Sequence, residues 1–398
     1  MSTPSRIRFA VIGAGRGKSF IKATGNPGST VDLTAICDRN PAALAAWKDS
    51  TEITLYSDFE QVLNDPKIDA VCLATPVHLH ARQAIAALNA GKHVLSEVSA
   101  AYTIEECWDL VAAVEKSGKT YMMAENYCYT EPALQIRNMV EQGVFGEITY
   151  ASGSYIHDCR NLLFTPQGEL TWRGELRRDI GPGNGYPTHS LGPIAQWLGI
   201  NRTDALKSTA TWCSGSHAIV NYAKRNHPGQ ADYQESNFWA HADTASTCIR
   251  TEKGVLIDIR VDSVSPRPHH MNRYELQGTK ASYSLPDGPT HVPLVWIEDR
   301  SPTNERGIAL EWEPLSNYRE EFEHPLWRKH REQAAQAGHG GGDYFILREF
   351  SSAISEGRLP MIDVYDAVTW SCITPLSFES VAKGNIPMAV PNFKGPRS

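Results

Sequence analysis

Residues 7–20 read IRFAVIGAGRGKSF, and this stretch decides the fold of the first part of the chain. A predicted strand at residues 8–13 leads into Gly13-Ala14-Gly15-Arg16-Gly17 and then into a predicted helix. Glycines at such a turn let the backbone approach a pyrophosphate, and the amino end of the helix attracts its negative charge. Lys18 stands where the third glycine of the usual G-x-G-x-x-G pattern would be, so the interpretation depends on the surrounding elements.

The elements that follow support a dinucleotide site. Further strands are predicted at residues 32–37, 70–74, 93–96 and 120–123. Helical segments separate them, and such alternation is typical of β-α-β units that build a parallel sheet. The second strand ends at Asp38, about 20 residues after the glycines, where a carboxylate holds the ribose hydroxyls of adenosine. We therefore expect a Rossmann domain that binds NAD, since Asp38 repels a 2′-phosphate, whereas the neighbouring Arg39 is suited to NADP.

The pattern changes after Asn126. A helix is predicted at residues 133–141, and strands of period two are predicted at residues 147–155, 245–250 and 255–261. Turn signals such as Lys253-Gly254 separate them, which indicates an open, largely antiparallel sheet. A chain of 398 residues exceeds what one hydrophobic core usually serves. We expect an α/β Rossmann domain at residues 1–126 and an α+β domain at residues 127–398, with the C-terminal segment packing back on the first domain.

Composition excludes several classes of function. The formal net charge is −7 and no basic run is present, so nucleic acid and anionic membrane surfaces are unsuitable partners. No apolar stretch approaches the roughly 20 residues that cross a bilayer. The short polar amino terminus leaves no room for a secretion signal, which predicts a cytoplasmic protein. Eight scattered cysteines without a Cys-x-x-Cys pair predict neither a disulfide framework nor a zinc site, and His269-His270 lacks a third metal ligand.

Two motifs at strand ends resemble the Gfo/Idh/MocA oxidoreductase superfamily. They are Ala74-Thr75-Pro76 with His78 and His80, and Gly91-Lys92-His93-Val94-Leu95-Ser96-Glu97. The resemblance implies that the Thr-Pro loop lies along the dinucleotide. It adds these residues to the cofactor site: Thr75, Pro76, His78, His80, Glu97 and Val98. The superfamily usually has Glu-Lys-Pro where this chain has Glu97-Val98-Ser99. In those members the lysine assists net dehydrogenation, and this chain has Val98 in its place.

The second half resembles one branch of that superfamily, the NAD-dependent glycosidases of glycoside hydrolase family 109. The most specific motif is Gly185-Tyr186-Pro187-Thr188-His189-Ser190-Leu191-Gly192-Pro193. Residues 123–126, 153–158, 265–268, 339–343 and 362–366 carry the other similarities. The family is best known for α-N-acetylgalactosaminidase activity, and the resemblance implies a homodimer or homotetramer. His269 replaces a tyrosine that we expect after Arg-Pro in this branch, so the sugar specificity need not carry over.

The resemblance also implies a mechanism. Bound NAD⁺ takes a hydride from C3 of the sugar, the C2 proton is then removed, the aglycone leaves by elimination, water adds, and the hydride returns. His189 is the expected base for the C3 hydroxyl, because imidazole titrates near working pH, with Tyr186 beside it. Tyr155 is expected to take the C2 proton, and His157 points to the same face of a strand.

Substrate contacts are expected from Glu125, Arg173 and His269, and Glu125 is suited to the nicotinamide ribose as well. Structural roles without catalysis remain open for these residues: His189 as a loop cap, Tyr155 as a residue that lines the site, and His78 and His80 as residues that shape the cofactor loop. The rival functions are a conventional NAD-dependent sugar dehydrogenase and a non-catalytic sugar or nucleotide sensor on the same fold.

Overall fold

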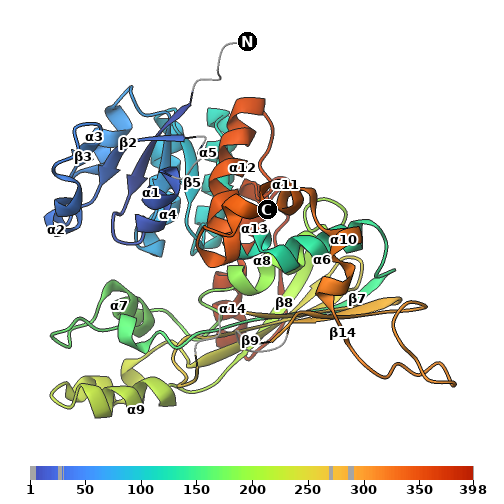
Figure 1. Ribbon diagram of the computed structural model, residues 1–398. Helices are drawn as coiled ribbons and strands as arrows, with labels where there is room; N and C mark the ends of the chain where they lie inside the picture. The colour runs from blue at the N-terminus through green and yellow to red at the C-terminus, as the bar shows by residue number, and fades with distance from the viewer. Residues whose placement is uncertain (1–5, 26–28, 30, 269–271, 286–290, 398) are drawn as a thin grey trace, which may run out of the picture. The chain divides into compact units, whose positions relative to one another are not determined.

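The predicted parallel sheet has six strands in the order β3-β2-β1-β4-β5-β6 (Figure 1). The structure is a computed structural model, and it describes residues 6–25, 29, 31–268, 272–285 and 291–397. The strands are β1 (Ile7–Ile12), β2 (Val31–Cys37), β3 (Thr54–Tyr56), β4 (Ala70–Leu73), β5 (His93–Ser96) and β6 (Tyr121–Met123). β4 and β6 are buried at every position, as expected for strands covered on both faces. The prediction missed only β3 among these strands, because its three residues are exposed or half-buried and give neither a continuous apolar run nor a clear alternation.

Helices connect these strands. They are α1 (Lys18–Thr24), α2 (Pro41–Leu44), α3 (Phe59–Asn64), α4 (His80–Asn89) and α5 (Ile104–Ser117). A capping box starts α5: the Thr103 hydroxyl accepts a hydrogen bond from the Glu106 amide at 3.1 Å, and the Glu106 carboxylate accepts one from the Thr103 amide at 3.1 Å. Gly118 ends the helix in the left-handed conformation. Each contact satisfies a backbone group that the helix end leaves open.

Segments from late in the sequence complete the same unit. It comprises Met1–Leu134, His324–Cys372 and Asn392–Ser398. The late helices are α11 (Pro325–Ala334), α12 (Gly342–Glu356) and α13 (Val364–Ser371). α13 packs on α5, and the Ala100 amide donates to the Ser371 hydroxyl at 2.9 Å. The Phe393 ring lies 4.8 Å from that of Trp108, so the last described residues also belong to this unit.

A second unit comprises Gln135–Glu323 and Ile373–Pro391. Its sheet has the order β14-β13-β12-β11-β7-β10-β9-β8-β15. The strands are β7 (Ile148–Ile156), β8 (Leu206–Cys213), β9 (Thr244–Thr251), β10 (Leu256–Asp262), β11 (Arg273–Gly278), β12 (Ala281–Leu285), β13 (Leu294–Ile297), β14 (Glu313–Pro314) and β15 (Met388–Ala389). Among the described strands, β7 and β10 pair in parallel and the other pairs are antiparallel. The expected mixed fold, with a largely antiparallel second sheet, is confirmed.

One face of this sheet carries two helices, α8 (Thr188–Trp197) and α14 (Ile373–Ala382) (Figure 1). Gly153, Ile259, Thr247 and Thr211 stand opposite one another on successive strands, so their side chains share a face. α8 lies against Gly153, and the Ser380 hydroxyl of α14 accepts a hydrogen bond from the Thr211 amide at 3.1 Å. Both helices therefore cover the same face, and residues two apart from Gly153 on β7 point toward α8.

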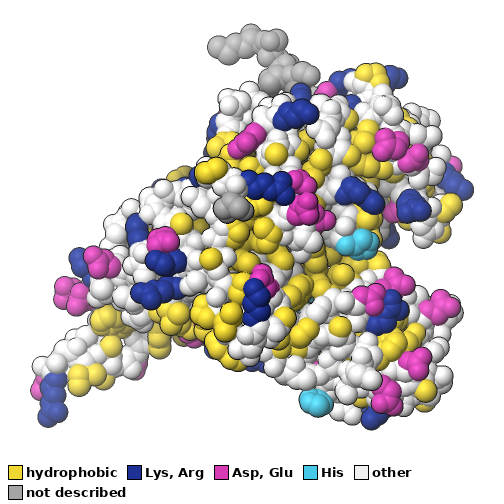
Figure 2. Space-filling view, turned by 180° about the vertical axis from the view of Figure 1, so that it is seen from behind, with side chains coloured by type: hydrophobic (Ala, Val, Ile, Leu, Met, Phe, Trp, Pro, Cys, Tyr) yellow, Lys and Arg dark blue, Asp and Glu magenta, His cyan; other side chains and the backbone are white. Residues whose placement is uncertain are grey.

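The remaining helices of this unit lie outside the sheet. They are α7 (Trp172–Asp179), α9 (His217–Asn226) and α10 (Arg319–Phe322), while α6 (Glu131–Glu141) runs across the boundary between the units. Between β13 and β14 the chain extends into an arm, residues 298–312, which carries apolar side chains along it (Figure 2). Ile308, Leu310 and Trp312 of the arm are 47–61% exposed. The second unit thus presents apolar surface outside its core.

Candidate active site

The glycine-rich turn follows β1 and lies against the end of β4. Gly13 has a φ of +94°, and a Cβ on it would lie 2.5 Å from the backbone oxygen of Ala74, so only glycine fits there. A Cβ on Gly17 would meet Val11 at 2.4 Å. Gly15 is exposed, and a Cβ on it would meet nothing within 4 Å. Open space beside the middle glycine is what a backbone needs for close approach to a pyrophosphate.

Asp38 follows β2 and is tied to the same turn. One carboxylate oxygen accepts a hydrogen bond from the Ala14 amide at 2.8 Å, and the other accepts one from the Asn40 amide at 2.8 Å. Each oxygen has a further lone pair for a ribose hydroxyl. The Arg39 side chain next to it is exposed. The position expected to bind adenosine is therefore fixed by backbone contacts before any ligand arrives.

His80 joins two loops on this edge of the sheet. Its ring nitrogens lie 2.9 Å from the Thr75 oxygen and 2.8 Å from the Ser99 oxygen. The ring is buried, and burial lowers the pKa of His80 although the two carbonyl contacts oppose this. The Thr75 hydroxyl bonds to Gln83, Pro76 is half-buried, and His78 is exposed. The buried His80 ring therefore holds the Thr75 loop beside the loop of residues 97–99.

Glu97 and Glu125 end the next two strands. The Arg16 guanidinium lies 2.8 Å from the Glu97 carboxylate, which ties the glycine turn to the end of β5. Val98 is buried directly after it. Glu125 is fully buried after β6 and accepts a hydrogen bond from the Tyr127 amide, which starts the short 3-10 helix η3 (Asn126–Tyr129).

The first-unit site residues all lie where parallel strands end, which is where ligands bind in open α/β sheets. Their chemistry fits NAD. Asn126 is buried, and its side-chain oxygen accepts no hydrogen bond from the described residues. An unsatisfied buried acceptor is costly in an interior, and a ligand amide or hydroxyl satisfies it. Sequence reasoning did not select Asn126, because an asparagine after a strand is a common turn residue.

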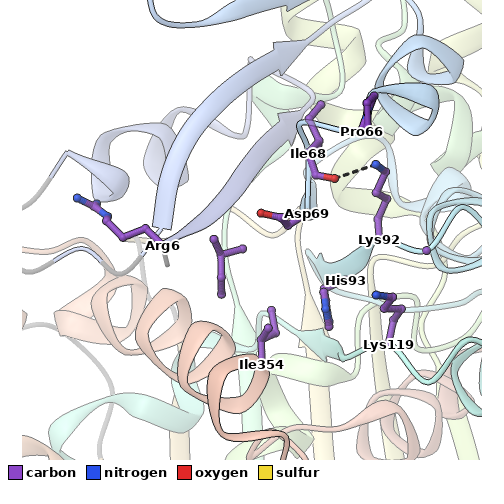
Figure 3. A pocket seen from close by; sticks show the side chains of 10 residues that line it. Arg6, Pro66, Ile68, Asp69, Lys92, His93, Lys119 and Ile354 are labelled. Atoms are coloured by element: carbon purple, nitrogen blue, oxygen red, sulfur yellow. Dashed lines mark hydrogen bonds between the residues drawn. The ribbon is translucent and has the colours of Figure 1, made fainter. Parts of the chain in front are cut away.

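A cavity of about 440 Å³ in the first unit lies at the opposite edge of the parallel sheet (Figure 3). Arg6, Asp69, Lys92, His93 and Lys119 line it, and all of them stand at or near the start of strands. The Lys92 ammonium donates to the Ile68 oxygen at 2.8 Å, and burial lowers the pKa of this group. This cavity is therefore separate from the cofactor edge.

The second unit brings together the four predicted catalytic residues. Tyr155 near the end of β7 lies between three other rings, with centroid separations of 4.7 Å to His189, 5.5 Å to Tyr186 and 5.8 Å to His157. Tyr186 and His189 are 5.0 Å apart. His189 is 8% exposed, and the other three are half-buried. Two phenols and two imidazoles thus form one cluster, called the ring cluster below.

Close packing between β7 and α8 positions the ring cluster. A Cβ on Gly153 would lie 2.1 Å from the backbone oxygen of Ser190, so the strand touches the helix backbone directly. The Tyr274 hydroxyl donates a hydrogen bond to the backbone oxygen of His189. His157 is fixed through its amide, which donates to the Asp262 oxygen at 2.8 Å. Backbone contacts of the strand and the helix therefore set the positions from which the rings project.

The loop before α8 depends on residues that sequence reasoning missed. Asn184 is fully buried: its amide donates to the Ser377 hydroxyl at 2.7 Å, and its side chain accepts from the Tyr186 amide at 3.3 Å. The His241 ring lies 3.0 Å from the Gly181 oxygen. Burial lowers the pKa of His241 to about 3, so the ring stays neutral. Proline and glycine cluster at residues 181–193, but this composition gives no sign of these partners.

The remaining predicted residues are placed as follows. Arg173 lies in the first turn of α7, and its guanidinium stands 4.3 Å from the centre of the Trp172 ring. Burial raises the pKa of Cys159, and the positive charge of Arg173 opposes this rise. His269 lies outside the described residues. All eight cysteines are free thiols. Across the part of the chain that the structure describes, no group of three or more potential metal ligands is found, and every helix is too short or too polar to cross a bilayer.

Comparison with known proteins gives matches for both parts of the chain. Residues 7–125 match the model "oxidoreductase family, NAD-binding Rossmann fold", and residues 129–397 match "glycosyl hydrolase 109, C-terminal domain". A glycosyl hydrolase family 109 protein of Solibacter usitatus is 37% identical over 97% of this chain and 88% of its own length. Another, of Stenotrophomonas maltophilia, is 33% identical over 98% and 89%.

Solved structures support the fold. Levoglucosan dehydrogenase in complex with NADH and L-sorbose aligns with a TM-score of 0.77 at 22% identity, over 98% of this chain and 100% of its own. An oxidoreductase domain protein from Kribbella flavida aligns with a TM-score of 0.74 at 19% identity, over 97% and 100%.

Proposed function

The chain belongs to glycosyl hydrolase family 109 and is an NAD-dependent enzyme of the glycosidase or sugar oxidoreductase class, and we propose that it hydrolyses glycosides through transient oxidation of the sugar. When bound, NAD⁺ supplies a hydride acceptor for C3 of the sugar and gives the same hydride back before the product leaves. The net reaction adds one water across the glycosidic bond and yields a free sugar and an alcohol. The cofactor is therefore needed and not consumed.

The ring cluster is the observation that carries this proposal. Ordinary glycosidases hold two carboxylates across the scissile bond. The ring cluster instead presents two imidazoles and two phenols within 6 Å of the Tyr155 ring or of one another. Such groups move protons to and from hydroxyl groups and acidic C–H bonds. Proton transfer around a temporarily oxidised sugar needs this chemistry.

Each proton has an assigned group. His189 takes the proton of the C3 hydroxyl while C3 becomes a ketone, and Tyr186 hydrogen-bonds the same oxygen. The ketone acidifies C2, and Tyr155 removes the C2 proton with help from His157. The electron pair released at C2 forms the C1–C2 double bond as the C1–O bond breaks, and the departing aglycone oxygen takes up the proton held by Tyr155. Water then adds its oxygen at C1 and passes one of its protons through Tyr155 to C2, and His189 returns its proton to the C3 oxygen.

Charged side chains orient the ligands in this scheme. We assign sugar contacts to Arg173 and His269, and Glu125 to the sugar or to the nicotinamide ribose. The remaining cofactor contacts are assigned to Gly13, Gly15, Arg16, Gly17, Asp38, Arg39, Thr75, Pro76, His78, His80, Glu97 and Val98. Asp38 favours the ribose hydroxyls of NAD over a 2′-phosphate.

Val98 separates this proposal from net sugar oxidation, the second candidate function. The residue is buried and apolar at the position where the superfamily usually carries a lysine. An ammonium group there polarises the reacting carbinol, and an isopropyl group does not. Glycoside cleavage without accumulation of NADH supports the hydrolase, whereas steady NADH formation from a free sugar and added NAD⁺ supports a dehydrogenase.

The decisive experiment incubates the protein with α- and β-nitrophenyl glycosides in heavy water. We expect nitrophenol release with deuterium at C2 of the product sugar, detected by mass spectrometry and NMR. His189→Ala and Tyr155→Phe are each expected to lower the rate by a factor of about 10² or more, because each removes a proton-transfer group.

Two matched variants control for general damage. His217→Ala and Tyr233→Phe change the same residue types elsewhere in the second unit, at an exposed and a half-buried position. Both are expected to keep full activity. Full activity in His189→Ala and Tyr155→Phe as well contradicts the assignment of the ring cluster, and the absence of turnover on every glycoside and sugar favours a sensor.

The proposal places this enzyme in the cytoplasm as a homodimer or homotetramer. Eight free thiols suit a reducing compartment. The exposed apolar residues of the arm support self-association, because a contact between subunits would remove their side chains from water.

A further inference from the structure

A tight turn at residues 338–343, Gly-His-Gly-Gly-Gly-Asp, leads into α12 of the first unit. The proposed reaction gives this turn no role. His339, Gly340 and Gly341 have φ values of +51°, +62° and +91°, so three successive residues are left-handed. A histidine with positive φ is uncommon, and such conformations cluster at functional sites, where the surrounding structure enforces them.

A buried carboxylate holds the His339 ring. Nδ1 of His339 lies 3.1 and 3.0 Å from the two carboxylate oxygens of Asp343. Asp343 is 4% exposed and stands in the first turn of α12, where the helix dipole also favours negative charge. The hydrogen bond and the charge of Asp343 raise the pKa of His339 above its usual range, against opposition from burial. The ring is therefore favoured as an imidazolium.

The turn lies on the cofactor edge of the first unit. Three charged groups face His339: Asp343, Arg16 of the glycine turn, and Glu97 after β5. Gly342 packs on the backbone of Asn126, since a Cβ there would lie 2.5 Å from the Asn126 oxygen. Three neighbours of the turn, Arg16, Glu97 and Asn126, thus lie just after the ends of parallel strands. A dinucleotide binds at this edge of the sheet.

The exposed nitrogen of His339 is available for a ligand. The side chain is 31% exposed, and Nε2 makes no hydrogen bond with any described residue. Arg16 is already paired with Glu97 at 2.8 Å, so much of its positive charge is neutralised before a ligand binds. The imidazolium of His339 adds a second cation beside the glycine turn.

We propose that His339 is a further cofactor-binding residue, whose Nε2–H donates a charge-assisted hydrogen bond to the pyrophosphate of NAD. Asp343 acts as a positioning residue that orients the ring and maintains its charge. Charged donors of this kind are the strongest partners of phosphate oxygens. The inference depends on the NAD site and not on the glycosidase reaction, so it is tested by binding alone.

The proposal predicts a definite pH dependence. Below the raised pKa of His339 the imidazolium faces the anionic pyrophosphate, and binding is strongest. As the pH rises through that pKa, the ring loses its proton and the negative charge of Asp343 is left uncompensated. The dissociation constant therefore increases with pH.

The test uses calorimetric titration of the nucleotide-free protein from about pH 6 to about pH 9, a range that spans histidine titration. The probes are ADP-ribose, which contains the pyrophosphate, and adenosine, which does not. We expect ADP-ribose to bind the unmodified protein at least about tenfold more weakly at the high end, as the loss of one charge-assisted hydrogen bond predicts. His339→Gln binds ADP-ribose weakly at every pH, and adenosine affinity is equal in both proteins.

Two further variants sharpen the result. Asp343→Asn removes the charge that favours the imidazolium, so the fall in affinity moves to lower pH. His291→Gln alters an exposed histidine of the second unit and leaves the whole profile unchanged. Wild-type affinity and wild-type pH dependence in His339→Gln overturn the proposal, even if Asp343→Asn fails to fold. A protein that shows the expected profile but cleaves no glycoside contradicts only the proposed function.

Discussion

Gly153 shows how a single missing side chain determines the geometry of the ring cluster. A methyl group at this position meets the Ser190 backbone oxygen at 2.1 Å, and a backbone atom cannot rotate away. Gly153→Ala therefore forces β7 and α8 apart and carries Tyr155 away from His189. We expect a loss of about 1–3 kcal/mol in the free energy of unfolding, as for other overpacked sites, together with a lower kcat. Urea denaturation and steady-state kinetics measure the two effects.

Gly229→Ala provides the matched comparison. A Cβ on Gly229 meets nothing within 4 Å, and the φ of Gly229 is not positive. The free energy of unfolding and kcat of this variant are therefore expected to stay close to those of the unmodified protein. Equal stability of the two variants would mean that β7 and α8 tolerate a separation that their contact distance excludes.

Single residues also show what a sequence can and cannot reveal about a site. Tyr155 and His157 were predicted to share a face because strand side chains alternate, and Tyr186 and His189 were selected through family resemblance. The structure brings all four together. Asn184 escaped prediction because its partner Ser377 is 193 residues away in the chain, and no local pattern encodes such a contact.

At the scale of elements, the loop at residues 181–187 helps to position the ring cluster and has no regular secondary structure. Asn184 holds it through Ser377 and the Tyr186 amide, and its side-chain amide reaches Thr247 at 3.4 Å. Asn184→Ala leaves buried polar groups without partners, which typically costs about 1–3 kcal/mol. We expect kcat for glycoside cleavage to fall about tenfold, whereas the dissociation constant of NAD stays constant because the first unit is untouched.

Asn226→Ala is the control for this element. Asn226 is exposed, and its side chain donates to the Tyr222 oxygen near the end of α9. Its removal is expected to leave kcat unchanged. If Asn184→Ala cleaves glycosides at the unmodified rate, the amide does not hold the loop in its active form.

Elements were predictable where they were long or strongly patterned. The strands β1, β2, β4, β5 and β6 of the parallel sheet and the strands β7, β9 and β10 follow from hydrophobic period and turn residues. β3, β14 and β15 have two or three residues each and exist only because neighbouring strands offer hydrogen bonds. Their formation depends on tertiary context, which a local pattern does not contain.

At the scale of the whole molecule, the first unit depends on the last described residues. Phe393 is 3% exposed and packs on Trp108 of α5. Phe393→Ala opens a cavity in this contact, and large-to-small changes of a buried phenylalanine cost about 3–5 kcal/mol. We expect differential scanning calorimetry to show a lower unfolding temperature, and titration to show weaker NAD binding, because NAD stabilises only the folded unit.

Arg397→Gln tests whether charge at the same segment matters. Arg397 pairs with Asp109 at 3.0 Å, but both side chains are about half exposed. Exposed pairs contribute about 0–1 kcal/mol, so a small change is expected. If Arg397→Gln lowered the unfolding temperature as much as Phe393→Ala does, the segment would be held by its charges and not by its aromatic ring.

The discontinuous path of the first unit has a consequence for synthesis. The chain leaves this unit after Leu134 and returns at His324 and again at Asn392. While the ribosome is still translating the middle of the message, the nascent β-α-β units lack the helices that cover α5, and their apolar sides remain open to chaperones. We therefore expect the nucleotide site to form fully only after synthesis has reached the segment that carries Phe393.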